Sequence, residues 1–356
     1  MNNIVITGLG AISPAGVGKE ALLKAIHGKV SHIRRLTKFQ GPSAESTAGE
    51  INEFRAEDYI RDKRFRRIAD ISQYAITAGV SAVNDGNINL EKYSPERTGL
   101  IMCITHGAIG YSSRFHKELL CDGPQAASPA LFSESVLNAP AGNVSGYFGI
   151  KGPVHTLIGG STSVIEAIRL VEHLFETDRI DCCFLGAAEE LNEIAFNAYA
   201  RFGFTFAPGE GAGMLIFERR ENVSGKGRGY AVVKGSYSGF CHKNAREDFL
   251  QRVMERCLKK AGLSIGNITN VFINSQDGKN AVEKLFMSQK NKPHTENISH
   301  LMGEAFCATT IFHMIIASLL LCDNLNRAGN VMIGAVSIEG NTASLVMSEV
   351  SDLQGG

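Results

Sequence analysis

The stretch GPVHTLIGGSTSVIEAIRLVEHL (residues 152–174) predicts the local fold that organises the rest of the chain. Residues 154–158 have the apolar and β-branched composition of a strand, and Gly159 to Ser163 form a short glycine-rich turn. After this turn, apolar side chains fall on one face of a predicted helix, at positions 164, 165, 168, 171 and 174. The stretch therefore predicts a strand, a tight turn and a helix, with Ser161 in the turn.

Similar units extend on both sides of this stretch. Residues 4–10 predict a buried strand that ends in a glycine turn, and a helix is expected at 19–26. Further helices are predicted at 68–83 and 138–149, and further strands at 99–103, 181–186 and 214–217. Alternating strands and helices favour an α/β fold, with a mixed or parallel sheet covered by helices.

A polar, glycine-bearing connector at 219–228 indicates a join between two halves. Beyond it, strands are predicted at 230–234, 270–273, 331–336 and 343–348, and helices at 248–261 and 303–321. The order of elements is comparable in the two halves, without a clear residue-level repeat. We therefore predict an N-terminal half at 1–222 and a C-terminal half at 223–356.

The composition excludes several classes of function. Lys and Arg together number 36, as do Asp and Glu, so no net field attracts nucleic acid. The beginning of the chain lacks the charge and hydropathy pattern of a signal peptide, and no apolar run is long enough to span a bilayer, so we expect a cytoplasmic protein without membrane insertion. The eight cysteines show no metal-like spacing, which favours buried, reduced thiols and no bound metal.

Several motifs, taken in order, resemble the β-ketoacyl-[acyl-carrier-protein] synthase (ketosynthase) family over nearly the whole chain. They are VITGLGAISP (5–14), RLTKF (35–39), GP (152–153), RF (201–202), GEGAG (209–213) and GNTASL (340–345). The resemblance implies a thiolase-like five-layered αβαβα fold made of two pseudo-repeated halves. It also implies no cofactor, because acyl groups arrive on the phosphopantetheine of an acyl carrier protein.

The same resemblance assigns the catalytic positions. In the family, a cysteine at the start of a buried helix accepts the acyl group, and two histidines assist decarboxylation of a malonyl unit. Ser161 stands at the cysteine position, Gln276 at the first histidine position and His300 at the second, while Thr295 replaces a lysine. The backbone N–H groups of Ser161 and Ile338, the latter at the gating position, are expected to form an oxyanion site.

These replacements argue against condensation. A hydroxyl is far less acidic than a thiol and needs a general base, and an amide cannot exchange a proton near neutral pH. The resemblance therefore implies a chain length factor, inactive alone, that pairs with an active ketosynthase in a polyketide, fatty-acid or aryl-polyene-type pathway and binds an acyl carrier protein. Chain length factors usually carry glutamine at the nucleophile position, from which Ser161 departs.

Other interpretations stay open. Ser161 with His300 suits a serine-dependent acyltransferase or thioesterase, and Ser161 is also a plausible helix cap without chemistry. An independently competent ketosynthase is the least favoured interpretation. Some further residues are interpreted as structural, namely His106, His155, His173 and His313, the glycines at 209, 211 and 213, and Met254, Met302, Met314 and Met332.

Overall fold

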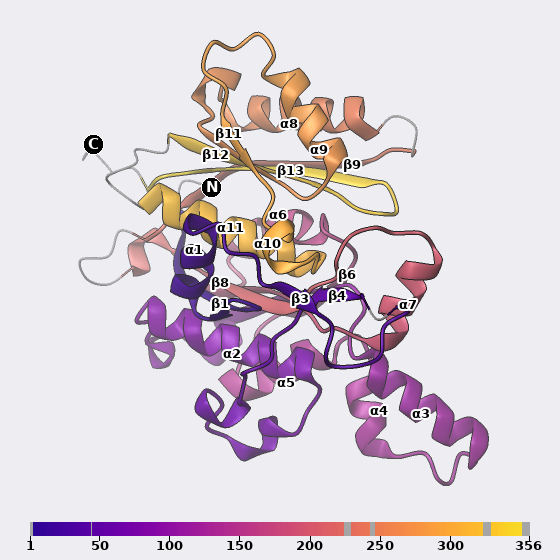
Figure 1. Ribbon diagram of the computed structural model, residues 1–356. Helices are drawn as coiled ribbons and strands as arrows, with labels where there is room; N and C mark the ends of the chain where they lie inside the picture. The colour runs from indigo at the N-terminus through magenta and orange to yellow at the C-terminus, as the bar shows by residue number, and fades with distance from the viewer. Residues whose placement is uncertain (1–2, 44, 224–228, 243–245, 323–328, 351–356) are drawn as a thin grey trace.

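Two β-sheets and three layers of helices alternate in the structure, a computed structural model (Figure 1). It describes residues 3–43, 45–223, 229–242, 246–322 and 329–350, without the side chains of Arg246, Gln276 and Asp277. The five-layered αβαβα arrangement predicted from the sequence is confirmed. Each sheet is drawn from one part of the chain, the first from residues 4–219 and the second from residues 232–348.

The first sheet has six strands in the order β2-β1-β8-β7-β5-β6. The pairs β1–β8 and β7–β8 are antiparallel, whereas β5 runs parallel to β6 and β7. The strands are β1 (Ile4–Ser13), β2 (Gly16–Val17), β5 (Thr98–Ile104), β6 (Val154–Ile158), β7 (Cys182–Glu189) and β8 (Gly211–Arg219). This order leaves β6, which leads into the turn of Ser161, at an edge of the sheet.

The second sheet has five strands in the order β11-β10-β12-β13-β9. Strand β10 is parallel to β11 and β12, and the remaining pairs are antiparallel. The strands are β9 (Val232–Phe240), β10 (Asn270–Ile273), β11 (His294–Glu296), β12 (Asn330–Val336) and β13 (Asn341–Ser348). A short hairpin, β3 (Ile33–Arg35) and β4 (Thr47–Gly49), lies apart from both sheets.

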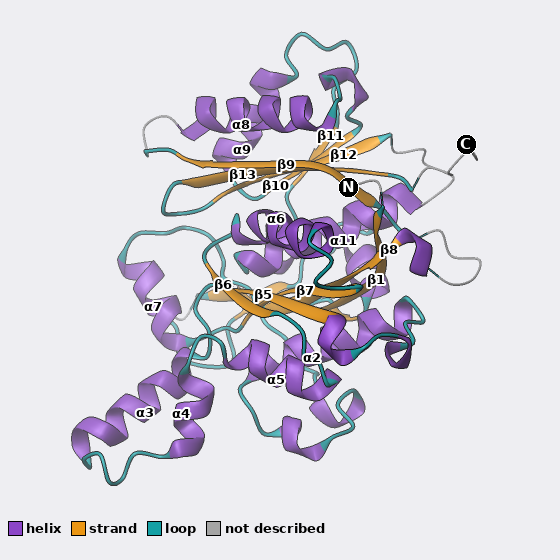
Figure 2. Cartoon of the chain, turned by 180° about the vertical axis from the view of Figure 1, so that it is seen from behind, coloured by secondary structure: helices purple, strands orange, loops and turns teal. Residues whose placement is uncertain are grey.

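Helices α6 (Ser163–Glu176) and α11 (Cys307–Cys322) fill the layer between the two sheets (Figure 2). Nearly every described side chain of α11 is buried, as expected for a helix that is apolar all round and covered on all sides. Helix α1 (Lys19–His27) packs beside it. The outer layers are α2 (Asp70–Asp85) and α5 (Ala139–Phe148) on the first sheet, and α8 (Arg246–Ala261) and α9 (Gln276–Leu285) on the second.

Close contact between α2 and β1 explains a glycine in the first motif. A Cβ atom at Gly10 would lie 1.9 Å from the carbonyl oxygen of Ala78, a distance that no side chain permits. Because glycine lacks this atom, α2 can pack directly on the strand. The first sheet and its outer helices therefore form one tightly packed body beneath the cavity described below.

The structure corrects some sequence-based expectations. The helix expected from Gly303 begins only at Cys307, because Gly303 has φ +80° and the N–H of Glu304 donates to the carbonyl of Ala207 (2.8 Å). The expectation of buried thiols is wrong for Cys121 and Cys322, which are exposed, and for Cys241, which is half-buried. The four methionines interpreted as core residues are all buried. The division at 222/223 stays a prediction.

Five of the described α-helices were not predicted. They are α3 (Ile109–Cys121), α4 (Pro129–Ser135), α7 (Glu193–Arg201), α9 (Gln276–Leu285) and α10 (Ser299–Met302). Helices α3 and α4 form a hairpin that projects from the body of the molecule (Figures 1 and 2), and no residue of α3 is buried. A helix that buries no residue lacks the apolar stripe by which helices are found in a sequence.

Candidate functional site

Ser161 lies in a turn whose second glycine, Gly160, packs closely against a neighbouring segment. Strand β6 ends at Ile158, and α6 begins at Ser163. A Cβ atom at Gly160 would meet the Cβ of Ser337 at 3.0 Å and a carboxylate oxygen of Glu339 at 3.4 Å. The turn therefore passes directly against the segment that joins β12 to β13.

The backbone of this turn is held by buried hydrogen bonds. Thr310 Oγ1, from α11, donates to the carbonyl oxygen of Ser161 (2.6 Å), and Ser163 Oγ donates to that of Gly160 (2.8 Å). The N-cap residue of α6 is Thr162, and no side chain makes a cap hydrogen bond there. The cap interpretation of Ser161 thus finds no support, and its side chain lines a cavity instead.

His300 reaches the same cavity from a short helix, α10 (Ser299–Met302), that precedes α11. The helix is anchored by its neighbours, because Asn297 Oδ1 accepts hydrogen bonds from the N–H (3.0 Å) and the hydroxyl (2.7 Å) of Ser299. The carbonyl of Leu301 accepts one from the N–H of His32 (2.7 Å). The imidazole of His300 is exposed, and no described residue makes a hydrogen bond to it.

Both halves of the chain contribute to this cavity of about 620 Å³. Ser161 comes from the first half, and His300 and Ile338 come from the second. Other walls are built by Thr105, Tyr199, the loop 203–207, Asn274 and Ser275. The structure therefore brings together three of the four residues that the sequence singled out.

Gln276, the fourth, begins α9, but its side chain lies outside the part of the chain that is described. The two residues before it are fixed. Asn274 exchanges two hydrogen bonds with the backbone of Val336, each 3.0 Å long, and the hydroxyl of Ser275 accepts one from the N–H of Gly278 (3.1 Å). The role assigned to Gln276 stays a prediction.

Ile338 lies in the tight turn between β12 and β13. The N–H of Gly340 donates to the carbonyl of Ser337 (3.2 Å), and Gly340 has φ +111°, which favours glycine. This turn faces the turn of Ser161 across the contact at Gly160. The oxyanion site expected from the N–H groups of Ser161 and Ile338 stays a prediction.

Two glutamates that the sequence analysis did not select line the same cavity, Glu304 and Glu339. Glu304 is buried, and burial raises the pKa of its carboxyl group to about 7. One of its carboxylate oxygens accepts a hydrogen bond from the N–H of Phe306 (2.8 Å). No local sequence pattern marks Glu304, because its raised pKa comes from burial in the folded chain.

A chain of polar groups lies at one wall. His106 Nε2 and the hydroxyl of Tyr199 form a hydrogen bond of 2.6 Å, and Nδ1 contacts the carboxylate of Glu189. Burial alone would lower the pKa of His106, but the charge of Glu189, the hydrogen bond to it and the charge of Glu339 together raise that pKa. His106 thus has the structural pairing expected from the sequence. His155 differs, because it is exposed on the edge strand β6.

The described residues contain no group of three or more His, Cys, Asp or Glu side chains arranged to hold a metal ion. None of the helices in the described part of the chain combines the length and apolarity needed to span a bilayer.

Comparisons with known proteins identify relatives of the chain. Residues 1–222 match the family described as beta-ketoacyl synthase, N-terminal domain. The chain is 29% identical over 264 residues to 3-oxoacyl-[acyl-carrier-protein] synthase 2 of Staphylococcus aureus (strain COL), covering 65% of this chain and 61% of that protein. The enzyme of the same name from Vibrio cholerae serotype O1 is 26% identical over 257 residues, covering 65% and 62%. The match thus spans less than two thirds of these relatives.

Solved structures resemble the chain over nearly its whole length. The ishigamide ketosynthase/chain length factor has a TM-score of 0.84 at 19% identity and covers 98% of this chain and 100% of its own. A type II polyketide acyl-carrier protein in complex with its ketosynthase gives 0.82 at 16% identity, covering 98% and 99%. A beta-ketoacyl synthase from Burkholderia phymatum STM815 gives 0.81 at 18% identity, covering 99% and 100%. These likenesses show a thiolase-like fold.

Proposed function

Because this chain belongs to the beta-ketoacyl synthase family, we propose that it is a non-condensing subunit, a chain length factor, that pairs with an active ketosynthase. The pair would work in a type II polyketide, fatty-acid or aryl-polyene-type pathway, in which this chain helps to shape the tunnel for the acyl group. The observation that carries the proposal is Ser161, an alcohol at the start of α6 that lines the cavity shared by both halves of the chain.

The surroundings of Ser161 do not supply what an alcohol nucleophile needs. A serine hydroxyl becomes a useful nucleophile when a general base lies within hydrogen-bond distance. No described residue makes a hydrogen bond to the hydroxyl of Ser161. Without that base, the positive end of α6 alone cannot ionise an alcohol near neutral pH.

A substitute thiol is also missing from the described part of the cavity. One candidate is Cys307, whose Sγ accepts a hydrogen bond from Oγ1 of the lining residue Thr105 (3.4 Å) and donates to the carbonyl of Cys103 (3.3 Å). Cys307 is fully buried, and burial raises the pKa of its thiol well above the ordinary value. A thiol with such a pKa is not a thiolate at neutral pH, so Cys307 does not replace the family nucleophile.

The partner would bind at the edge of the first sheet that β6 forms. Strand β6 has an unpaired edge, and two of its apolar side chains are exposed, Val154 (39%) and Ile158 (61%). The projecting α3–α4 hairpin exposes Leu120 and Phe132. Unpaired strand edges and exposed large apolar side chains are features that a partner chain covers. We propose an active ketosynthase as that partner.

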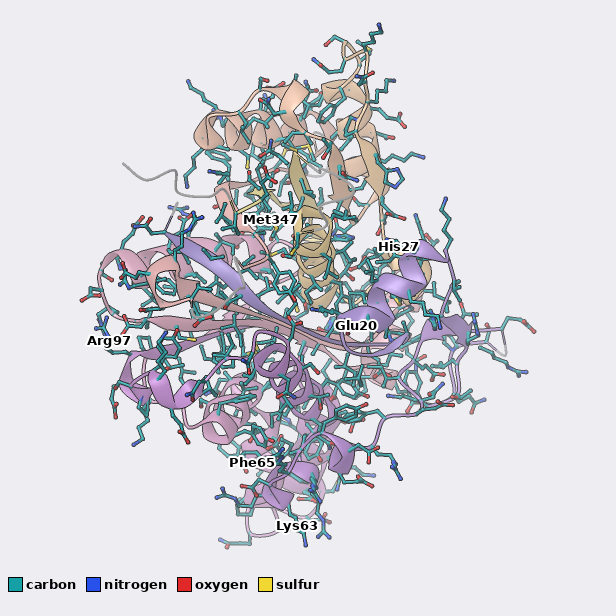
Figure 3. All side chains as sticks on the ribbon, turned by 90° about the vertical axis from the view of Figure 1, so that its left-hand side faces the viewer. Glu20, His27, Lys63, Phe65, Arg97 and Met347 are labelled. Carbon is teal, nitrogen blue, oxygen red and sulfur yellow. The ribbon has the colours of Figure 1, made fainter. Side chains whose placement is uncertain are left out.

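A carrier protein would bind a basic segment on the outer layer below the first sheet. We define the basic segment as residues 61–67, RDKRFRR, which contains a 3₁₀ helix from Lys63 to Arg66. Figure 3 shows Lys63 and Phe65 at the end of the molecule remote from Met347 in the second sheet. Arg61, Lys63 and Arg67 are exposed, and no described residue forms an ion pair with them. Such a segment suits an acidic acyl carrier protein.

One observation favours the second candidate function, a serine-dependent acyltransferase or thioesterase. Ser161 and His300 line the same cavity, and movement of the exposed imidazole would bring a base to the hydroxyl. In that case an acyl group would move from the phosphopantetheine thiol of the carrier to Ser161 Oγ. The hydroxyl proton would pass through His300 to the leaving thiolate.

The two functions are separated by one pair of experiments. Purified chain is mixed with acyl-carrier thioesters, and the intact mass is measured for the natural chain and for Ser161→Ala. The chain length factor proposal predicts no adduct with either protein, and one-to-one co-purification with a cysteine-bearing ketosynthase. An adduct that disappears in Ser161→Ala would favour the acyltransferase, and elongation with malonyl units by the chain alone would refute both.

A further inference from the structure

The charged groups at the cavity have one sign. Among the described residues that line it, Glu304 and Glu339 carry carboxyl groups, His300 carries an imidazole, and none is Lys or Arg. An acyl group that enters this cavity therefore meets two carboxylates. This composition bears on which acyl groups the cavity accepts.

Glu304 is fixed in place by its backbone. Its N–H donates to the carbonyl of Ala207 (2.8 Å), and its own carbonyl accepts from the N–H of Gly209 (2.9 Å). Its carboxylate is held at the N–H of Phe306 (2.8 Å), so the group cannot turn out to solvent without losing a buried hydrogen bond. Since its pKa is about 7, Glu304 is mostly ionised at pH 8.

Glu339 approaches the cavity from the opposite strand connection. One of its carboxylate oxygens lies 3.4 Å from the position that a Cβ of Gly160 would occupy, next to Ser161. Burial raises the pKa of the Tyr199 hydroxyl, and the charges of Glu189, Glu339 and Glu304 raise it further. Both cavity glutamates therefore act at the same wall.

The positive charge at the cavity is weaker than the negative charge of the two glutamates. The start of α6 contributes about half a unit of positive charge, compared with two full charges on the glutamates. The other lining groups on this side are aromatic, with ring centroids 5.3 to 5.7 Å apart in the contacts of Tyr199, Phe204, Phe206 and Phe306. Such a wall binds an apolar chain through contact area alone.

We propose that the cavity accepts uncharged acyl thioesters and rejects carboxyacyl thioesters such as malonyl, with Glu304 and Glu339 as the specificity-determining residues. The inference rests on the proposed function, in that acyl groups reach the cavity on a phosphopantetheine arm. It adds a cause for the absence of condensation that is independent of Ser161. A chain that repels the malonyl carboxylate cannot hold the extender unit for decarboxylation.

The test compares two pantetheine thioesters of the same shape, malonyl-pantetheine and its monoamide, in which an uncharged carboxamide replaces the carboxylate. Binding to the natural chain is measured by titration calorimetry at pH 8. We expect the malonyl thioester to bind about tenfold more weakly, the effect of one to two like charges at cavity distances. In Glu304→Gln/Glu339→Gln, the two thioesters should bind within about twofold of each other.

A matched control is Glu255→Gln, which removes a negative charge from the exposed side of α8 and should keep the tenfold difference. If the substitution of the buried Glu304 prevents folding, Glu339→Gln alone tests the proposed selectivity, because Glu339 is exposed. This variant should reduce the difference in affinity between the two thioesters by about threefold.

Equal binding of the two thioesters to the natural chain would overturn the inference, as would binding of neither. Neither result affects the proposed pairing with a ketosynthase, because that pairing is measured separately by co-purification. Conversely, a chain that fails to pair but still distinguishes the two thioesters would leave the selectivity standing and remove the chain length factor proposal.

Discussion

The cavity and the basic segment carry charges of opposite sign in a chain whose formal net charge is zero. The cavity presents Glu304, which is buried, and Glu339, which is exposed beside the turn of Ser161, whereas segment 61–67 presents Arg61, Lys63 and Arg67 to solvent. Glu304 and the basic segment differ in burial as well as in the sign of their charge. Substitution of the buried Glu304 should alter the free energy of unfolding, and substitutions in the basic segment should alter only association.

The largest effect is expected from reversing the charge of the basic segment. Arg61→Glu/Lys63→Glu/Arg67→Glu should weaken binding of an acidic acyl carrier protein about 100-fold, because three favourable charge pairs become repulsive. The free energy of unfolding should change by less than about 0.5 kcal/mol, since these side chains are exposed. Both quantities are measurable, by surface plasmon resonance and by urea unfolding.

A charge reversal of equal size elsewhere provides the control. Lys259→Glu/Lys290→Glu/Lys292→Glu changes three exposed cations associated with the second sheet and should leave carrier binding within about threefold. If both triple variants bind equally, the carrier does not use the basic segment.

The next effect concerns pH and Glu304. Its pKa in the folded chain, about 7, lies above the ordinary value of 4.5, so the folded state keeps a proton that the unfolded state has lost between these pH values. The contribution of this group therefore makes the free energy of unfolding fall by about 1 to 3 kcal/mol as pH rises from 4.5 to 7. Glu304→Gln should remove that part of the slope in urea unfolding curves.

Glu255→Gln again serves as the control, because its carboxylate is exposed on α8 and should leave the slope unchanged. Burial also raises the pKa of Glu190, to about 8, so part of the slope should persist in Glu304→Gln up to that pH. A Glu304→Gln profile identical to that of the natural chain would contradict the assignment.

The smallest effect is expected at the hydrogen bond that fixes the turn of Ser161. Thr310→Val keeps the shape of the side chain but leaves the carbonyl of Ser161 without its 2.6 Å donor. A buried acceptor that loses its partner costs about 1 kcal/mol, so the midpoint of thermal unfolding should fall by about 1 to 2 °C. Thr310→Ser retains the hydroxyl and should lose less, whereas equal losses would assign the effect to packing.

The sequence predicted the elements that carry strong apolar patterns. Strands β6 and β10 have the predicted bounds, and the turn of Ser161 lies between strand and helix as expected. Helices α3, α4, α7, α9 and α10 were missed. Helix α3 buries no residue, α7 only Phe196 and α10 only Met302, so few core side chains mark them in the sequence. Local patterns therefore predicted the most strongly apolar strands and helices, but not the helices outside the layers nor α9 in an outer layer.

The site was predictable only in part, for a different reason. Ser161, His300 and Ile338 were found through motifs, but Glu304 acquires its raised pKa from burial, which depends on contacts with residues 207–209 far away in the sequence. The basic segment 61–67 is visible in the sequence, but the balanced total charge of the chain does not reveal it. Summed charge says nothing about where the charges lie.

Helix α11 packs against both sheets, so removal of the C-terminal part of the chain would affect the first sheet. It belongs to the C-terminal part, but its buried side chains cover β7 and β8 of the first sheet as well as β12 of the second. A polypeptide cut after residue 222 would keep all strands of the first sheet and lose the cover that α11 gives to its inner face. We therefore expect that fragment to precipitate when it is produced alone, although its boundary coincides with that of the matched family.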